Sequence, residues 1–277
     1  MLHARIGRAA ALAAAVLGAA ASASAQTAGR GAAPARAANR CAALPNHAAL
    51  KNALDQATAD EKSGLNNHMW ATIVDRDGVV CAVAFSGTDR FAQWPGSRVI
   101  SAQKASTAAA FNLDAASSSN GSGQAKGLLL STANLYSAVQ PSGSLFGLQF
   151  SNPVDTAVAY RGLYARYGTP TDPMVASRVG GVNVFGGGLA VFGAGKKMVG
   201  GLGVSGDTSC ADHSIAWLIR KNLSLDHLAG VGGVSGDNDR PDNIVFDIDP
   251  AGKSKDGFGH PQCINTGNAA ALPAVQQ

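Results

Sequence analysis

The chain has 277 residues, of which 46% are hydrophobic, 14% are charged and 34 are glycine, so it holds more glycine and less charge than an average soluble protein. This hydrophobic content excludes a disordered chain, and glycine without a three-residue period excludes a collagen-like one. The formal net charge of +4 is not gathered in a dense Lys/Arg stripe, which argues against nucleic acid as a partner. We therefore expect a globular protein with one domain.

The N-terminus has the pattern of a secretory signal peptide. His3, Arg5 and Arg8 precede the uncharged run 9–20, and the A-x-A pattern ends at Ala25. We predict that residues 1–25 are a signal peptide and that the Ala/Gly/Arg-rich residues 26–40 are a disordered linker. The apolar run is too short to span a membrane and no later run reaches about 18 residues, so we expect no membrane insertion. The mature protein is expected to be periplasmic or extracellular.

The chain has four cysteines, an even number without C-x-x-C spacing. In an oxidising compartment this pattern predicts two disulfides and not a zinc site. Three pairings are possible. We favour the pairing that ties a segment near each terminus to the body, which joins Cys41 to Cys81 and Cys210 to Cys263. Beyond the last cysteine, the Ala/Pro/Gln-rich residues 264–277 are predicted to form a disordered tail.

The first half of the body contains a helix, a hairpin and a second helix. Apolar residues at helical spacing after Asn46, a candidate N-cap, predict a helix that ends before Gly64. The β-rich runs 69–74 and 79–85 flank a tight turn containing Asp77-Gly78 and predict a hairpin. Residues 97–111 predict a second helix with Ser97 as N-cap, and its alanine-rich surface would allow close packing on a sheet.

The second half repeats this unit after a long insertion. Residues 115–178 contain a Ser/Gly/Asn-rich loop and several prolines, which indicate turns and short irregular pieces. The triglycine 186–188 then opens a second hairpin, with strands at 189–192 and 198–204, and residues 209–221 form a third helix. Two hairpin-helix units favour an α+β fold, an antiparallel sheet flanked by helices in a single domain that spans 41–263.

Residues 201–206 match the G-x-G-x-x-G pattern of dinucleotide sites, and Asp226 follows twenty residues later. The match comes late in the chain, and Asp207 and Asp212 place negative charge where a pyrophosphate would bind. We therefore interpret these glycines as a strand end where backbones approach closely.

Two histidines are the strongest candidates for cofactor ligands. His213 lies near the start of the third predicted helix, directly after the glycine-rich strand, where it could face a pocket. His260 lies three residues before Cys263 and would be anchored by a disulfide at that cysteine. For His47, His68 and His227, a surface or capping role is the better interpretation.

Three blocks of the chain together resemble the GlcG/HbpS-like haem-binding family: 71–78, 102–108, and 186–188 with 200–206 followed by Asp212. The resemblance covers about 46–221 and is interrupted by the insertion 115–178, which compact members lack. It implies a profilin-like α/β fold, self-association into homo-oligomers and, in several members, haem binding. It does not imply an enzyme. The positions that match are Lys104 and Thr107 on the second helix, and Asp212 with His213 on the third.

Our first hypothesis is an exported, oligomeric haem-binding protein that captures, stores or senses haem. Haem b would be held without covalent attachment, because the chain has no C-x-x-C-H motif. His213 is the predicted axial ligand and Lys104 the predicted partner of a propionate, with Thr107, Asp212 and His260 as further cofactor-binding candidates. The alternatives are a haem- or metal-dependent oxidoreductase, for which no distal acid–base pair is visible, and a non-catalytic scaffold without a cofactor.

Overall fold

A computed structural model describes residues 41–114 and 127–277, which lie in one compact unit. The predicted signal peptide 1–25, the predicted linker 26–40 and the first part of the insertion, 115–126, lie outside the described residues. None of the described helices has both the length and the apolar character needed to cross a membrane.

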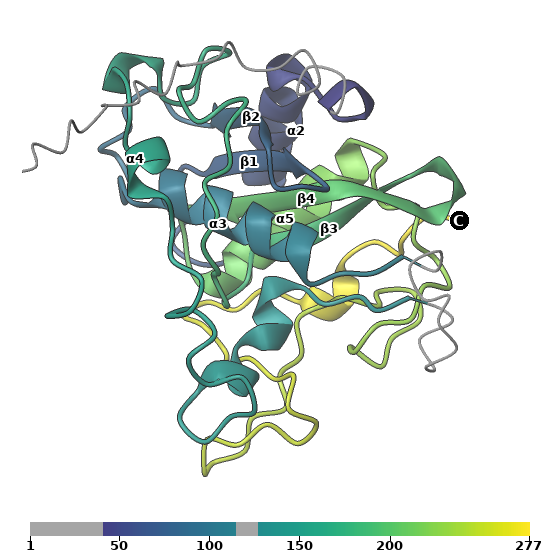
Figure 1. Cartoon of the computed structure of the whole chain (residues 1–277). Helices are drawn as coiled ribbons and strands as arrows, with labels where there is room; N and C mark the ends of the chain where they lie inside the picture. Colours follow the sequence, from purple (N-terminus) through teal and green to yellow (C-terminus); the bar gives the residue numbers. More distant parts are fainter. Residues whose placement is uncertain (1–40, 115–126) are drawn as a thin grey trace, which may run out of the picture. The chain divides into compact units, whose positions relative to one another are not determined.

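The centre of the fold is a four-stranded antiparallel sheet with the strand order β2-β1-β4-β3 (Figure 1). The two predicted hairpins lie next to each other and join through their inner strands, β1 and β4. This arrangement confirms the α+β class with an antiparallel sheet. The strands are β1 (Trp70–Asp75), β2 (Val80–Phe85), β3 (Gly188–Gly193) and β4 (Lys197–Ser205).

Three helices of fourteen residues each cover the sheet: α2 (His47–Asp60), α3 (Ser97–Ala110) and α5 (Ser209–Asn222). Helices α2 and α5 pack together on one face, and α3 packs on the other. Asn46 caps α2 as predicted, since its side chain accepts a hydrogen bond from the Ala49 amide. In α3 the N-cap is Gly96 and Ser97 is already the first helical residue, so the helix begins one position earlier than the predicted Ser97 cap implies.

The glycines of β4 allow α3 to lie directly on the sheet. A Cβ atom at Gly201 would come within 2.2 Å of the Ala105 carbonyl oxygen, and one at Gly203 within 1.9 Å of the Ser101 carbonyl oxygen. The G-x-G-x-x-G segment therefore provides close packing between strand and helix, and β4 is antiparallel to both of its neighbours. This agrees with the interpretation of these glycines as points of close backbone approach.

We expect Gly203→Ala to lower the free energy of unfolding by about 1–3 kcal/mol, because the added methyl group overlaps the backbone of α3. Gly193→Ala on β3 is the matched control: its nearest neighbour would be Val199 Cγ1 at 3.6 Å, an ordinary contact. Urea denaturation of both variants measures the difference. Equal free energies of unfolding for the two variants would show that α3 can move away from β4 at no cost and that the close packing does not stabilise the fold.

The described part of the insertion contains turns, isolated β-bridges and short helical pieces: η3 (Thr132–Leu135), η4 (Ser137–Val139), α4 (Thr156–Ala159) and η5 (Tyr164–Arg166). Its first half lies beside the C-terminal part of the chain, as the teal and yellow-green loops of Figure 1 show. The Ser137 hydroxyl donates to the Gly259 carbonyl at 2.6 Å. The insertion is thus part of the same body, as predicted for a single domain.

Residues 264–277, which we predicted to be a disordered tail, pack against the body in the structure. Trp217 Nε1 donates to the Pro273 carbonyl at 3.0 Å, and the Gln276 amide donates to the Asp226 carbonyl at 3.0 Å. Leu272 is only 6% exposed. The prediction was wrong because composition indicates only local preferences, whereas this segment is held by groups 50 or more residues away in sequence.

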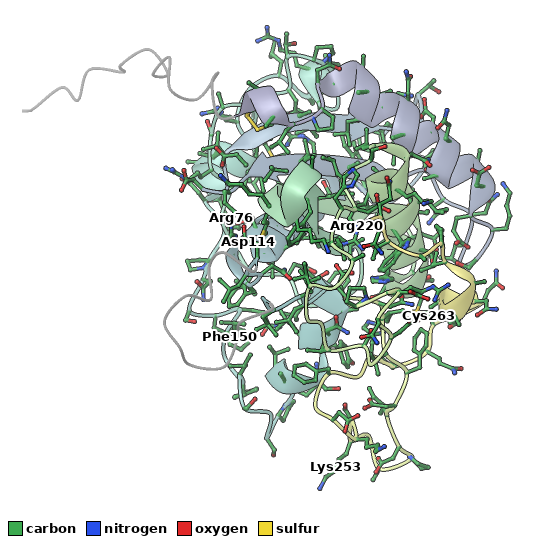
Figure 2. The ribbon with its side chains drawn as sticks, turned by 90° about the vertical axis from the view of Figure 1, so that its right-hand side faces the viewer. Arg76, Asp114, Phe150, Arg220, Lys253 and Cys263 are labelled. Atoms are coloured by element: carbon green, nitrogen blue, oxygen red, sulfur yellow. A yellow bond between two sulfur atoms is a disulfide. The ribbon has the colours of Figure 1, made fainter. Side chains whose placement is uncertain are left out.

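Both disulfides have the favoured pairing, Cys41 with Cys81 and Cys210 with Cys263. The first ties the start of the described chain to β2. The second ties the start of α5 to the C-terminal segment, where Figure 2 labels Cys263. This confirms the pairing.

Candidate functional site

The structure brings two predicted site residues, Lys104 and Asp212, into direct contact. Lys104 comes from α3 and Asp212 from α5, and the Lys104 Nζ lies 2.6 Å from Asp212 Oδ2. The ammonium group also donates to the Val204 carbonyl at 2.9 Å, and the Asp207 amide donates to Asp212 Oδ1 at 2.9 Å. Both side chains are buried, so this is an internal ion pair.

Burial is the dominant influence on this pair. It raises the pKa of Asp212 to about 6, although the nearby Lys104 acts in the opposite direction, and it lowers the pKa of Lys104. The Phe185 ring lies 4.5 Å from the Lys104 Nζ, which adds a cation–π contact. All the polar contacts of Lys104 are therefore internal, and reaching a haem propionate would require the covering segment to open.

Thr107 lies on α3 but does not contact this pair through its hydroxyl. Its Oγ1 donates to the Gln103 carbonyl at 2.8 Å and accepts a hydrogen bond from the Asn183 amide at 2.9 Å. The residue thereby holds the segment that leads into the triglycine.

His213 is completely buried on α5. Its Nε2 lies 3.1 Å from Asn243 Oδ1 and 3.2 Å from the Ile244 amide nitrogen, while Nδ1 has no hydrogen-bond partner among the described residues. Burial lowers the pKa of His213 to about 4, so the ring is neutral at pH 7. A neutral imidazole with a free nitrogen has the chemistry of a metal ligand, but residues 243–244 cover it.

His260 pairs with a serine at the first position of α5. Its Nε2 lies 2.7 Å from Ser209 Oγ, and its Nδ1 lies 2.6 Å from the Pro261 carbonyl oxygen. Because a carbonyl only accepts, Nδ1 carries the proton and Nε2 accepts from the serine hydroxyl. The Gly186 amide donates to the same hydroxyl at 2.7 Å. Burial lowers the pKa of His260 to about 4.

The predicted residues thus gather near the start of α5, with Thr107 apart from the others, but they do not border an open groove. Lys104, Asp212 and His213 have no exposed surface, and segments from the insertion and the C-terminus cover them. A porphyrin does not fit among these residues as the chain is folded. The sequence analysis named these residues as cofactor-binding candidates, but it carried no information about the segments that bury them.

A second site, which the sequence analysis did not identify, lies at the other end of α3. Two neighbouring cavities of about 450 and 210 Å³ share Trp70, Arg90 and Tyr167 in their walls. The larger one alone falls within the 300–1,000 Å³ range of small-molecule sites. We call the two cavities together the aromatic cleft and define it by its main wall residues: Trp70, Phe85, Arg90, Phe91, Tyr160, Tyr164 and Tyr167.

The aromatic cleft combines flat apolar walls with one positive charge. Trp70 and Phe85 stack with ring centroids 4.5 Å apart. The Arg90 guanidinium carbon lies 4.3 Å from the centre of the Phe91 ring and 4.5 Å from that of Tyr164. Arg90 forms no ion pair with any described residue, so its charge is available to an anionic ligand.

One buried donor in the wall of the cleft is also unused. Trp70 is 2% exposed, and its Nε1–H has no hydrogen-bond partner in the described part of the chain. A buried donor without an acceptor is unfavourable unless a water molecule or a ligand completes it. By contrast, Arg98 at the floor of the smaller cavity is neutralised by the buried Asp172, with which it forms a two-point ion pair.

One signal in the sequence could have indicated the cleft. Three of the four tyrosines of the chain lie in one stretch of eight residues inside the polar insertion: Tyr160, Tyr164 and Tyr167. Phe91 and Trp94 are similarly close together in the loop before α3, and four of these five side chains are more than a third exposed. Exposed aromatic residues gathered in loops are typical of binding surfaces.

The fold and its two sites define a single-domain α+β protein with a polar cluster sealed in its core and an open aromatic cleft. The chain belongs to the HbpS-like haem degrading protein family, whose family model matches residues 46–219. No curated protein sequence matches the chain.

Solved structures with a similar arrangement are distant in sequence. Protein ORFY of Klebsiella pneumoniae is 23% identical, with a TM-score of 0.41 over 65% of this chain and 90% of that chain. A PduOC–haem complex is 22% identical, with a TM-score of 0.42 over 65% of this chain and 95% of that chain. A double mutant of Streptomyces reticuli HbpS is 18% identical, with a TM-score of 0.38 over 64% of this chain and 83% of that chain.

Proposed function

We propose that this protein binds haem b without covalent attachment and captures, stores or senses it, with the aromatic cleft as the haem site. Membership of a family named for haem degradation supports haem as the ligand. The observation that carries the choice of site is the pair Arg90, which lies between the Phe91 and Tyr164 rings, and Trp70 Nε1–H, neither of which has an ion-pair or hydrogen-bond partner among the described residues of the cleft. A flat apolar ring with carboxylate groups is the ligand that matches these features.

The cleft residues have separable roles in this proposal. The aromatic walls stack against the ring and exclude water from it. Arg90 pairs with a carboxylate, and the Trp70 Nε1–H donates to a second acceptor on the ligand. Bound haem supplies an iron centre, whose reactivity is set by its axial ligand and by the surrounding pocket.

Tyrosine is the iron-ligating residue type that the cleft offers. The described residues that line its two cavities include no histidine, cysteine or methionine, whereas Tyr160 and Tyr164 are both exposed there. Tyrosine serves as an axial haem ligand in some proteins. We propose that Tyr164 would hold the iron, because its exposed ring lies in the wall of the larger cavity beside Arg90. His213 is a second candidate ligand, because its Nδ1 has no hydrogen-bond partner among the described residues. An iron could reach it only if residues 243–244 moved away.

Hemin titration of the purified protein tests the site. We expect a saturable Soret shift in the wild type and about tenfold weaker binding in Arg90→Ala, because a charge-assisted contact of about 1.5 kcal/mol is lost. Arg166→Ala is the matched control, since Arg166 is an exposed arginine in the same region that lines neither cavity. Equal hemin affinities in both variants would argue against the aromatic cleft.

Two further variants separate the iron ligands. Tyr164→Phe is expected to change the Soret position and His213→Gln to leave it unchanged. The opposite result would assign the iron to His213 and would mean that the C-terminal cover opens in solution. If the wild type gives no saturable shift, the non-catalytic scaffold becomes the better description.

The family's name also supports haem degradation as a second candidate function. Loss of the Soret band after addition of a reductant or peroxide, faster than for free hemin, would establish it. A Soret band that persists after addition of the reductant or peroxide would favour capture or storage.

The proposal includes export to the periplasm or the exterior and assembly into homo-oligomers. Two disulfides support an oxidising compartment, and the exposed Phe146 and Phe150 support a contact surface. Mass spectrometry of the mature chain and light scattering of the purified protein test these two points. A mature mass that still includes Met1 would contradict cleavage of a signal peptide.

A further inference from the structure

The second disulfide belongs to a cluster with the residue types of a metal site. Cys210 lies in the first turn of α5, while His260 and Cys263 lie in the C-terminal segment. The two Sγ atoms and one ring nitrogen of His260 all lie within 4.8 Å of one another. Cys210 and His260 are each 3% exposed, and Cys263 is partly exposed, so the cluster is internal with one open side.

This spacing suits a small tetrahedral ion. Zinc bonds of about 2.3 Å to sulfur and 2.0–2.1 Å to nitrogen place neighbouring ligand atoms about 3.3–3.8 Å apart. The disulfide keeps the two sulfurs closer than this. When that bond is broken, side-chain rotations within the cluster would bring the three ligand atoms, which all lie within 4.8 Å of one another, to the zinc separations.

The tautomer of His260 leaves one ring nitrogen able to bind a metal. Its Nδ1–H donates to the Pro261 carbonyl at 2.6 Å, which leaves the lone pair on Nε2. Metal-bound histidines almost always hold their second ring N–H in such a hydrogen bond. In the disulfide form this lone pair accepts from the Ser209 hydroxyl at 2.7 Å, so an ion bound at Nε2 would have to displace this hydrogen bond.

The surroundings also favour a thiolate at Cys263. The Cys210 amide donates to Cys263 Sγ at 3.1 Å, and this amide belongs to the first turn of α5. Amide donors and the positive end of a helix stabilise negative charge on sulfur. A hydrogen bond aimed at this sulfur already exists before reduction.

Other contacts hold the segment in place without the disulfide. The His260 amide donates to the Val245 carbonyl at 2.8 Å, and the Cys263 amide donates to Thr266 Oγ1 at 2.7 Å. Further along, the Trp217 indole holds Pro273. The two sulfurs therefore stay next to each other when the bond between them opens.

We propose that the reduced protein binds one Zn²⁺ ion through Cys210, Cys263 and His260, and that the disulfide is the metal-free state of the same site. A dithiol supplies two electrons and two protons, becomes a cyclic disulfide and leaves two cysteine thiols. The ion then displaces both thiol protons to solvent. Zn²⁺ with two thiolates and a neutral imidazole has no net charge, which suits an internal position, and a water molecule completes the tetrahedron.

Cobalt binding to the whole chain, before and after reduction by a dithiol that is then removed without air, tests the proposal. The reduced protein is expected to bind one Co²⁺ with thiolate-to-cobalt charge-transfer bands that Zn²⁺ abolishes, and the oxidised protein is expected to show none. His260→Gln should bind Co²⁺ at least about tenfold more weakly, since loss of a supporting group alone weakens metal sites 10–100-fold.

The first disulfide provides the matched control. The Cys41→Ser, Cys81→Ser double variant keeps the cluster and should bind Co²⁺ like the wild type, whereas the Cys210→Ser, Cys263→Ser double variant should not. Near-UV circular dichroism shows whether each reduced protein is folded. The proposal is overturned if the folded reduced wild type binds no cobalt, if the second double variant binds it, or if only an unfolded reduced chain does.

Discussion

Asp212→Asn is expected to lower the free energy of unfolding by about 3–5 kcal/mol, because it leaves the ammonium group of Lys104 buried and unpaired. The amide keeps the shape of the carboxylate and can still accept hydrogen bonds, so the change removes mainly the negative charge. Chemical denaturation at pH 7 measures the effect, and far-UV circular dichroism confirms that the variant folds.

Two comparisons identify the cause of this loss. Asp55→Asn breaks the partly exposed Lys51–Asp55 pair of α2 and should change the stability by less than about 1 kcal/mol. The Lys104→Met, Asp212→Leu double variant removes both charges and should be more stable than Asp212→Asn alone. If the single and double variants were equally unstable, lost packing would explain the result better than an unpaired charge.

The protein is expected to lose stability in acid between pH 6.5 and 4 through its two buried histidines. The folded-state pKa values of His213 and His260 are about 4, against 6.5 for a free histidine. In this range the unfolded chain binds protons that the folded chain does not, so the free energy of unfolding falls as the pH falls. A shift of about 2.5 pKa units corresponds to about 3 kcal/mol for each ring.

Asp212 acts in the opposite direction within the same range. Its folded-state pKa of about 6 lies above the usual 3.8, so the folded chain holds this proton more tightly and Asp212 favours folding towards low pH. Because the two effects oppose each other in the wild type, the test compares the acid-induced loss of stability of a histidine variant with that of the wild type. Between pH 7 and pH 4, His213→Gln should lose about 3 kcal/mol less than the wild type. The same acid sensitivity in both proteins would show that His213 does not titrate as a buried group.

Elements with local signals were predictable. The apolar spacing from Leu50 to Ala57 and the Asn46 cap indicated α2, and the Asp77-Gly78 turn indicated the first hairpin. The triglycine and the third helical pattern likewise matched β3 and α5. These signals lie within a few residues of the elements they specify, which is why they can be interpreted without knowledge of the fold.

The candidate site was predictable only in part. Lys104 and Asp212 do meet, but their complete burial depends on segments that pack from far away in sequence, such as Gly188 against Thr132 and Asn134 against Asn243. The aromatic cleft joins Trp70 of β1 with Arg90 and Tyr164, which are 20 and 94 residues further along the chain. Nothing in the local pattern at these residues indicates that they meet.

The amino-acid sequence by itself determined the helices, the two hairpins, the close packing made possible by the glycines of β4 and the set of cysteines available for bonding. Only the tertiary structure decided which polar residues are sealed from solvent, that the C-terminal segment is anchored, and where a ligand finds room. The physical reason is that secondary structure follows from the spacing of neighbouring residues, whereas burial and cavities depend on how distant segments fill the same space.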